Sequence, residues 1–162
     1  MIRKTEPFEL KESPDVPDLI LRNLQKTDGK MLGNLMYASY LGTVDYEGET
    51  LEETLAAAES TLEGQYGAII FDASFIAFQK DKETFAIAVS VLTDFEKTGP
   101  LLAFALTHPD FQKKGLSGHL IKLSTNSLSQ LNQPKISLVV TSTNEPAVSL
   151  YRKLGFEASN QS

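Results

Sequence analysis

The part of this chain best suited to chemistry is a lysine-bearing turn between an apolar run and an amphipathic helix. The run at 101–106 predicts a strand, which must end before Pro109 because proline cannot donate to a sheet ladder. A helical pattern begins near Gly115, and Lys113 and Lys114 stand just before it. A helix start with free N–H groups, a glycine and two lysines together favour the binding of an anion such as a phosphate.

The residue pattern of this turn narrows the phosphate-bearing ligands that it could bind. It matches neither G-x-x-x-x-G-K-[ST] nor G-x-G-x-x-G, so nucleotide hydrolysis and dinucleotide binding lose support. The turn instead contains Gln112-x-x-Gly115-x-Ser117. Because the segment reads Gly-x-Ser-Gly and not Gly-x-Ser-x-Gly, a hydrolase triad of Ser117 with His108 and Asp110 is disfavoured.

A second pattern follows the turn after one predicted helix and one predicted strand. It reads Asn-x-x-Ala-x-x-x-Tyr-x-x-x-Gly-Phe and places Asn144, Ala147, Tyr151, Gly155 and Phe156. The two patterns, in this order, resemble the two signatures of the GCN5-related N-acetyltransferase family. In that family the first signature is Gln/Arg-x-x-Gly-x-Gly/Ala, so this chain departs from it at one position, where a serine stands.

The resemblance implies that the cofactor is acetyl-CoA. Its diphosphate would bind backbone N–H groups of residues 113–118, and Asn144 would contact the pantetheine arm. The unusual Ser117 could add a hydrogen bond or crowd the coenzyme. The residues that the resemblance assigns to coenzyme binding are Leu106, Thr107, Gln112, Lys113, Lys114, Gly115, Leu116, Ser117, Gly118, Asn144, Ala147 and Tyr151.

The resemblance also implies direct transfer of the acetyl group to an amine within a ternary complex. Tyr151 would be the general acid for the departing thiolate, and backbone groups of Leu106 and Thr107 would polarise the thioester carbonyl. Tyr151 follows Asn144 by seven positions, about two helical turns, so both side chains can reach one groove. The chain has no cysteine, which excludes an acyl group carried on a thiol of the protein.

The acceptor site is predicted from the same resemblance, which places it between the first two helices, their connection at 42–49 and the central strands. Candidates to line it are Tyr37, Tyr40, Asp45, Glu47 and Asp72. A solvated acidic loop beside a helix stripe explains most of these residues equally well. Asp72 and His108 are further candidate proton acceptors, and the general base is not identified. The acceptor is expected to be a small-molecule or peptide amine.

A binding module is the competing function class. Such a protein would keep the coenzyme cradle and use acyl-CoA occupancy to regulate a partner. The unidentified base and the short segment after Phe156 support this alternative, whereas Tyr151 and the complete second pattern favour an enzyme.

Bulk properties exclude several other classes. The 162 residues suit one acetyltransferase domain over 1–162, and the charge of −6 disfavours general binding to nucleic acid. With no cysteine and two histidines, a metal site is not expected. The chain shows neither a membrane-spanning apolar run nor a charged-then-apolar leader, so we expect no membrane association and a cytoplasmic location.

The elements that must position these residues follow from hydrophobic periodicity and from start and stop signals. Thr27 is a candidate cap for a first helix, and the capping box Thr50-x-x-Glu53 announces a second. The predicted order is β-α-α-β-β-β-α-β-α-β in an α/β (α+β type) acetyltransferase fold, with a mixed sheet of about six to seven strands and helices on both faces. The predicted strands span 18–24, 68–78, 84–93, 101–107, 136–141 and 155–158, and the predicted helices begin near 27, 50, 115 and 144.

Both ends of the chain carry weaker expectations. Residues 1–16 are polar and punctuated by prolines, which suggests a short strand or an extension at a sheet edge. Only a few residues follow Phe156, so a full final hairpin cannot form and one wall of the acceptor site would be missing. A second subunit could replace that wall, which makes a homodimer reasonable.

Overall fold

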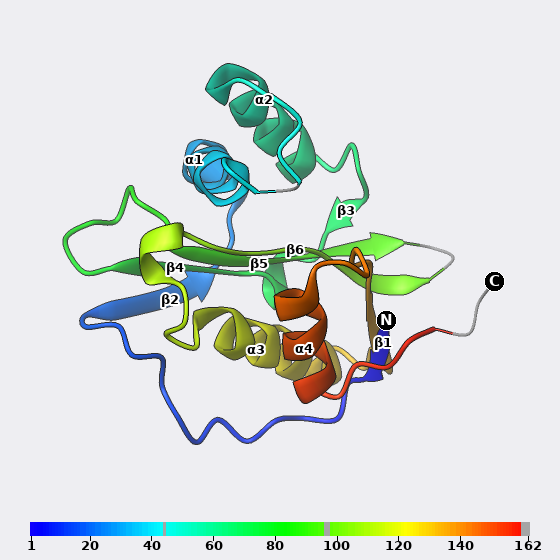
Figure 1. Ribbon diagram of the computed structural model, residues 1–162. Coiled ribbons are helices and arrows are strands. Elements are labelled where there is room, and N and C mark those ends of the chain that lie inside the picture. The colour runs from blue at the N-terminus through cyan, green and yellow to red at the C-terminus, as the bar shows by residue number, and fades with distance from the viewer. Residues whose placement is uncertain (44, 96–97, 160–162) are drawn as a thin grey trace.

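The computed structural model describes residues 1–43, 45–95 and 98–159, and these build one seven-stranded sheet with helices on both faces (Figure 1). The strand order is β1-β7-β6-β5-β4-β2, and β3 pairs with β5. Every pairing is antiparallel except that of β6 with β7. The strands are β1 (Ile2–Lys4), β2 (Leu19–Asn23), β3 (Ala68–Ile69), β4 (Phe75–Gln79), β5 (Ala88–Phe95), β6 (Gly99–Thr107) and β7 (Lys135–Leu138).

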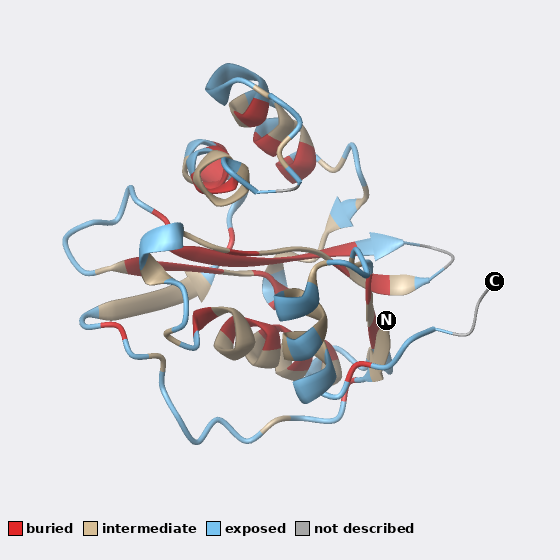
Figure 2. Cartoon of the chain, in the orientation of Figure 1, coloured by how far each residue is buried: buried red, intermediate tan, exposed pale blue. Residues whose placement is uncertain are grey.

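The α-helices of the described residues form two layers around this sheet. Helices α1 (Gly29–Tyr40) and α2 (Leu51–Leu62) cover one face, and α3 (Leu116–Gln130) and α4 (Glu145–Lys153) lie on the other (Figure 1). Buried residues follow the middle of the sheet and the sides of the helices that face it (Figure 2). This arrangement confirms the predicted fold class.

The N-terminal segment forms the strand at the β7 edge of the sheet. Strand β1 pairs with β7, with Ile2 opposite Ser137. Ile2 also exchanges two backbone hydrogen bonds of 2.9 Å with Glu157, and this single bridge is what exists of the predicted strand at 155–158. The edge beside β7 is therefore completed by this chain itself.

Three other predicted boundaries were wrong. The strand predicted at 68–78 is interrupted by the 3-10 helix η2 (Phe71–Ala73), where the Ser74 hydroxyl accepts from Leu92 N at 2.9 Å and so replaces a strand partner. The strand predicted at 84–93 is β5, which begins only at Ala88. The parallel strand predicted at 136–141 is β7, which ends at Leu138.

The start of α1 is organised by Asp28 and not by the predicted cap Thr27. Thr27 lies inside the 3-10 helix η1 (Lys26–Asp28). The buried Asp28 carboxylate accepts from Gln25 N at 2.8 Å and forms a bidentate ion pair with Arg22, with both N···O distances 2.8 Å. The carboxylate raises the pKa of the Arg22 guanidinium by hydrogen bonding to it. Each oxygen of this carboxylate, which is 4% exposed, thus has a hydrogen-bond partner, as a buried carboxylate requires.

Residues between β1 and β2 form a strap that crosses the outer side of α3 (Figure 1). Asn126 of α3 holds Phe8 by two hydrogen bonds, accepting from Phe8 N at 2.7 Å and donating to Phe8 O at 3.0 Å. Further along, Asp15 N donates to Lys114 O at 2.9 Å. The strap thereby fixes one side of the turn that precedes α3.

The contact between α1 and α2 predicts an unusual response to Gly33→Ala. Glycine to alanine inside a helix normally stabilises by about 1 kcal/mol. At Gly33 the new Cβ would lie 2.9 Å from Leu55 Cα, so we expect a loss of about 1–3 kcal/mol in a urea denaturation experiment. Gly118→Ala in α3 is the matched control, because its Cβ would make an ordinary contact of 3.6 Å with Leu150 and should stabilise the protein. Equal stabilisation by both substitutions would contradict this packing.

Candidate active site

A wedge opens in the sheet between β6 and β7. The two parallel strands pair over two residues only, near the start of β6 and at the end of β7, with Leu101 opposite Ser137 and Leu102 opposite Leu138. Strand β7 ends at Leu138, whereas β6 continues to Thr107. The second half of β6 therefore has a neighbour on one side, β5, and none in register on the other.

Hydrogen-bond direction in β6 identifies the backbone groups that face this wedge. His108 N donates to Ile87 O at 2.8 Å, and Leu106 lies opposite Val89 in the same register. Since hydrogen-bonded pairs alternate in an antiparallel ladder, Leu106 bonds to β5, and Thr107 and Ala105 direct their backbone groups away from it. Leu106, predicted together with Thr107, is thus turned to the sheet, and its side chain is buried in the core. Ala105 was not among the predicted residues, and the two-residue alternation shows only that it shares the direction of Thr107.

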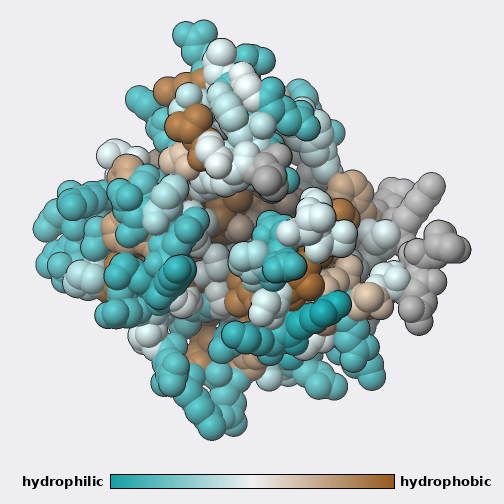
Figure 3. Space-filling view, viewed as in Figure 1, coloured by the Kyte–Doolittle hydropathy of each residue, from teal (hydrophilic) through white to brown (hydrophobic). Residues whose placement is uncertain are grey.

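The wedge continues into a cleft of about 570 Å³ between β6, the start of α3 and the start of α4. In the space-filling view a hollow with apolar atoms inside it lies near the centre of the face, between the α1–α2 layer and α4 (Figure 3). The residues that line the cleft are Ala105, Thr107, Phe111, Gln112, Lys113, Gly115, Leu116, Ser117, Gly118, Asn144, Pro146, Ala147, Leu150 and Tyr151. Most residues predicted for coenzyme binding are among them.

The turn on one side of the cleft leaves the first N–H groups of α3 without a side-chain cap. Gly115 is the N-cap residue, has φ +83° and makes no side-chain hydrogen bond to the helix, whereas Thr50 and Asn144 cap α2 and α4. Lys113 is exposed and lines the cleft. Lys114 does not line it, and its carbonyl is held by the strap. The uncapped N–H groups and one lysine thus present positive charge to the cleft.

Helix α4 supplies the opposite wall of the cleft. Asn144 accepts from Ala147 N at 3.3 Å, so it caps the helix and lines the cleft at the same time. The Tyr151 ring meets Phe156 edge to face, with the ring centroids 5.9 Å apart. Burial raises the pKa of Tyr151 above 10. Its hydroxyl is therefore protonated at neutral pH, which is the state that a general acid requires.

A smaller cavity of about 120 Å³ lies between α1, α2 and their connection. Tyr37 and Tyr40 line it as predicted, together with the unpredicted Tyr46, Glu49 and Glu53, and with Met36, Thr54 and Ala57. Burial first, and then the charges of Asp45, of Tyr151 when that phenol is ionised, and of Glu49, raise the pKa of Tyr40 to about 12. Tyr40 thus lies close enough to interact electrostatically with the acids beside this cavity and with Tyr151. Asp45 and Glu47 are exposed and do not line the cavity.

Comparisons with known proteins agree with this geometry. The family model described as FR47-like protein matches residues 78–162, just over half of the chain. This chain belongs to the FR47-like family. A search of curated proteins finds no significant match.

Solved structures with the same fold are acetyltransferases of several kinds. PaiA N-acetyltransferase from Thermoplasma acidophilum in complex with coenzyme A has a TM-score of 0.66 at 18% identity, over 89% of this chain and 92% of that one. Aminoglycoside N-acetyltransferase AAC(6')-Iy in complex with CoA has a TM-score of 0.65 at 16% identity, over 95% of both chains. Ribosomal-protein-alanine N-acetyltransferase from Brucella melitensis biovar Abortus 2308 has a TM-score of 0.62 at 15% identity, over 89% and 96%. The acetyltransferase fold predicted from the two signatures is confirmed.

Two predicted residues of this FR47-like chain lie away from the cleft. Asp72 is exposed and belongs to η2, which packs on α3. This part of the fold lies near Leu102, at the end of β6 that is remote from Thr107. His108 accepts from Asp110 N through Nδ1 at 3.1 Å and lines a separate cavity of about 340 Å³ beside α1. The structure therefore brings neither side chain to Tyr151.

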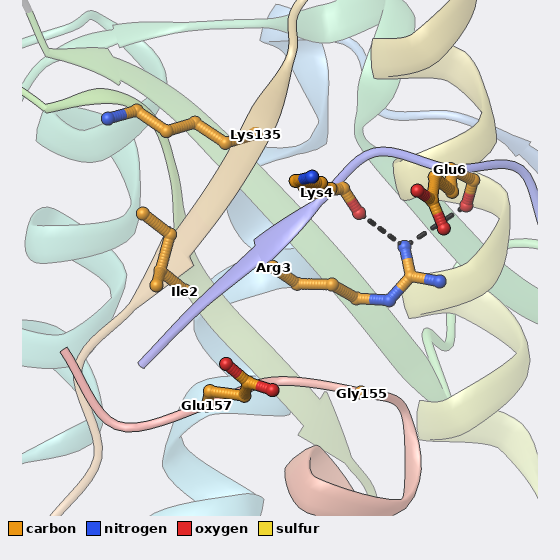
Figure 4. Close-up of a pocket in the computed structure, with 7 residues that line it drawn as sticks. All are labelled: Ile2, Arg3, Lys4, Glu6, Lys135, Gly155 and Glu157. Carbon is orange, nitrogen blue, oxygen red and sulfur yellow. Dashed lines mark hydrogen bonds between the residues drawn. The ribbon is translucent and has the colours of Figure 1, made fainter.

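The cavity at the β1 edge has the same volume as the cleft, about 570 Å³, and the Arg3 guanidinium in it already has backbone partners (Figure 4). Arg3 donates to the carbonyl oxygens of Leu154 at 2.7 Å, Lys4 at 2.6 Å and Glu6 at 3.1 Å. Burial lowers the pKa of this guanidinium. We interpret Arg3 as a structural residue that joins β1 to the end of α4.

Within residues 1–43, 45–95 and 98–159, no group of three or more His, Cys, Asp or Glu side chains could hold a metal ion. No helix in these ranges has the length and apolar character needed to cross a membrane.

Proposed function

We propose that this chain transfers the acetyl group of acetyl-CoA directly to a primary amine in a ternary complex. The observation that carries the proposal is the wedge between β6 and β7, with free backbone groups on β6 and an uncapped helix start beside it. A coenzyme with an anionic diphosphate and an amide-bearing arm matches these two features in one cleft. When bound, acetyl-CoA supplies an activated acetyl thioester.

Each wall of the cleft has a role in this proposal. The N–H groups of Leu116, Ser117 and Gly118, with Lys113, would bind the diphosphate. Backbone groups of Ala105 and Thr107 would hold the pantetheine arm and donate to the thioester carbonyl as negative charge develops on it. Asn144 and Ala147 would border the arm from α4.

Tyr151 would supply the proton that the sulfur atom of the departing coenzyme A requires. Its Oη–H belongs to a group whose pKa is raised by burial, so the phenol keeps its proton at neutral pH and can donate it to sulfur as the C–S bond breaks and the acceptor nitrogen loses its proton. The alternative of a regulatory acyl-CoA-binding module does not use this proton. Thiol release with an amine panel therefore distinguishes the two, because a module would bind acetyl-CoA without turnover on any amine.

The distribution of charge supports a cationic amine as the acceptor. Residues 31–79, which include most of α1 and all of α2, carry eight acidic side chains and no Lys, Arg or His. The remainder of the chain has a formal charge of +2, although the total is −6. Coenzyme phosphates would thus meet the basic part and an ammonium group the acidic part. The aromatic faces of the tyrosines that line the small cavity also attract cations.

Glu53→Gln tests the acceptor side of the proposal. Glu53 lines the small cavity and also accepts from Thr50 N at 3.2 Å, a capping bond that glutamine can keep. We expect the KM for a diamine to rise about 5-fold and the KM for a monoamine to change less, because a hydrogen-bonded charge is worth roughly 1–3 kcal/mol. Glu52→Gln is the control, since Glu52 is exposed on the same helix and lines no part of the cavity. Equal effects of the two variants would refute this acceptor site.

A further inference from the structure

Two hydroxyl side chains meet at the boundary between the wedge and the coenzyme turn. Thr107 Oγ1 at the end of β6 and Ser117 Oγ in the first turn of α3 are 2.6 Å apart, and either atom can be the donor. Both residues line the cleft and both are half-buried. Ser117 is the position at which the first signature has Gly or Ala, so this hydrogen bond is specific to chains with a hydroxyl there.

Thr107 is held from two directions. Its side chain bonds to α3, and its carbonyl oxygen accepts from Ser39 Oγ of α1 at 3.4 Å. Ser39 stands between Tyr37 and Tyr40, which line the small cavity. Thr107 therefore contacts both α3, which follows the proposed coenzyme turn, and α1, which borders the small cavity.

The hydrogen bond also restricts where the Ser117 hydroxyl can point. At 2.6 Å from Thr107 Oγ1 it is directed to β6. The two effects expected for this serine, an added ligand contact or crowding, both concern the coenzyme. The structure shows a contact within the protein.

We infer that Ser117 and Thr107 are positioning residues, which set the free backbone groups at the end of β6 relative to the N–H groups of α3. This inference rests on the proposed function. A coenzyme that contacts both elements binds more tightly when the distance between them is already fixed in the free protein. Less conformational entropy is then lost on binding. The hydroxyl pair acts through the backbone and does not itself touch the reacting atoms.

The test is a double-mutant cycle on coenzyme A affinity, measured by isothermal titration calorimetry. We expect Ser117→Ala and Thr107→Val each to weaken coenzyme A about 5-fold, and the double variant to be about as weak as either single one, because all three lack the same bond. Thr107→Ser keeps a hydroxyl and should restore most of the affinity. Additive losses, or unchanged affinity in Ser117→Ala, would overturn the inference.

A second hydroxyl pair provides the matched control. Ser90 Oγ and Ser124 Oγ are 2.8 Å apart, buried between β5 and the same face of α3, seven residues beyond Ser117. Ser124→Ala should lower the melting temperature and leave coenzyme A affinity within about 2-fold. Equal weakening by Ser124→Ala would show that the Ser117 effect is general destabilisation and would sink the inference. Failure of the unmodified protein to bind coenzyme A would instead refute the proposed function.

Discussion

Tyr151→Phe is expected to lower kcat for acetyl transfer about 100-fold and to leave the Kd for coenzyme A within about 2-fold. The variant removes only the hydroxyl, because phenylalanine can keep the edge-to-face contact with Phe156. Loss of a general acid acts on the transition state, whereas the cleft wall that binds the coenzyme is retained. Steady-state thiol release and calorimetric titration measure the two quantities separately.

Tyr40→Phe is the control for this experiment, because Tyr40 is the other buried phenol near the cleft. Its pKa of about 12 means that it holds its proton more tightly than an ordinary tyrosine. We expect Tyr40→Phe to change the KM for the acceptor more than kcat. A large loss of kcat in Tyr40→Phe with normal kcat in Tyr151→Phe would transfer the role of acid to Tyr40.

The raised pKa of Tyr151 also predicts the alkaline pH profile. Burial keeps the proton bound as pH rises through 10, the ordinary value for a phenol, so the acid form persists above that pH. On this basis kcat should not fall until pH exceeds about 10 in the unmodified protein. A decline that begins near pH 8 would indicate a different acid.

Gly115→Val is expected to weaken coenzyme A binding about 30-fold or more. Gly115 has φ +83°, a conformation that a β-branched residue adopts only at a cost of about 1–3 kcal/mol. The cause is conformational and not steric, since the nearest atom to a new Cβ would be Pro14 Cα at 4.0 Å. Relief of the strain would shift the N–H groups that follow in α3, and these are the groups assigned to the diphosphate.

Gly115→Asn separates this conformational cause from loss of the fold. Asparagine tolerates the left-handed region better than other residues with a side chain, so the variant should keep most of the affinity. Thermal melting of both variants checks that the protein remains folded. Equal affinity of Gly115→Val and the unmodified protein would contradict the assignment of this turn to coenzyme A.

Local patterns made much of the fold predictable. The capping box at Thr50 and Glu53 is present with both hydrogen bonds, and α2 begins at the next residue. The two signatures lie on facing walls of one cleft, as their resemblance to the acetyltransferases implied. Features of this kind depend on neighbours within one or two helical turns, so the sequence contains the information directly.

Other features depend on partners far along the chain. Nothing in Ile2–Lys4 indicates β7, about 130 residues away, as the strand it pairs with. Asp28 and not Thr27 organises the start of α1 because Arg22, on a different element, supplies its partner. The backbone role predicted for Leu106 depends on a distant partner in the same way, because its register with Val89 sets the direction of its N–H.

By itself the sequence determined the family resemblance, the order of most elements and the turn and helix that we assign to the coenzyme. These follow from residue types at fixed short spacings, where chain connectivity restricts the geometry. Only the tertiary structure decided that Ala105 and Thr107 face the wedge, that β1 closes the sheet edge and that Ser117 bonds to Thr107. The physical reason is that strand register and the splay of β6 from β7 arise from packing of the whole sheet between its two helical layers, which no local segment specifies.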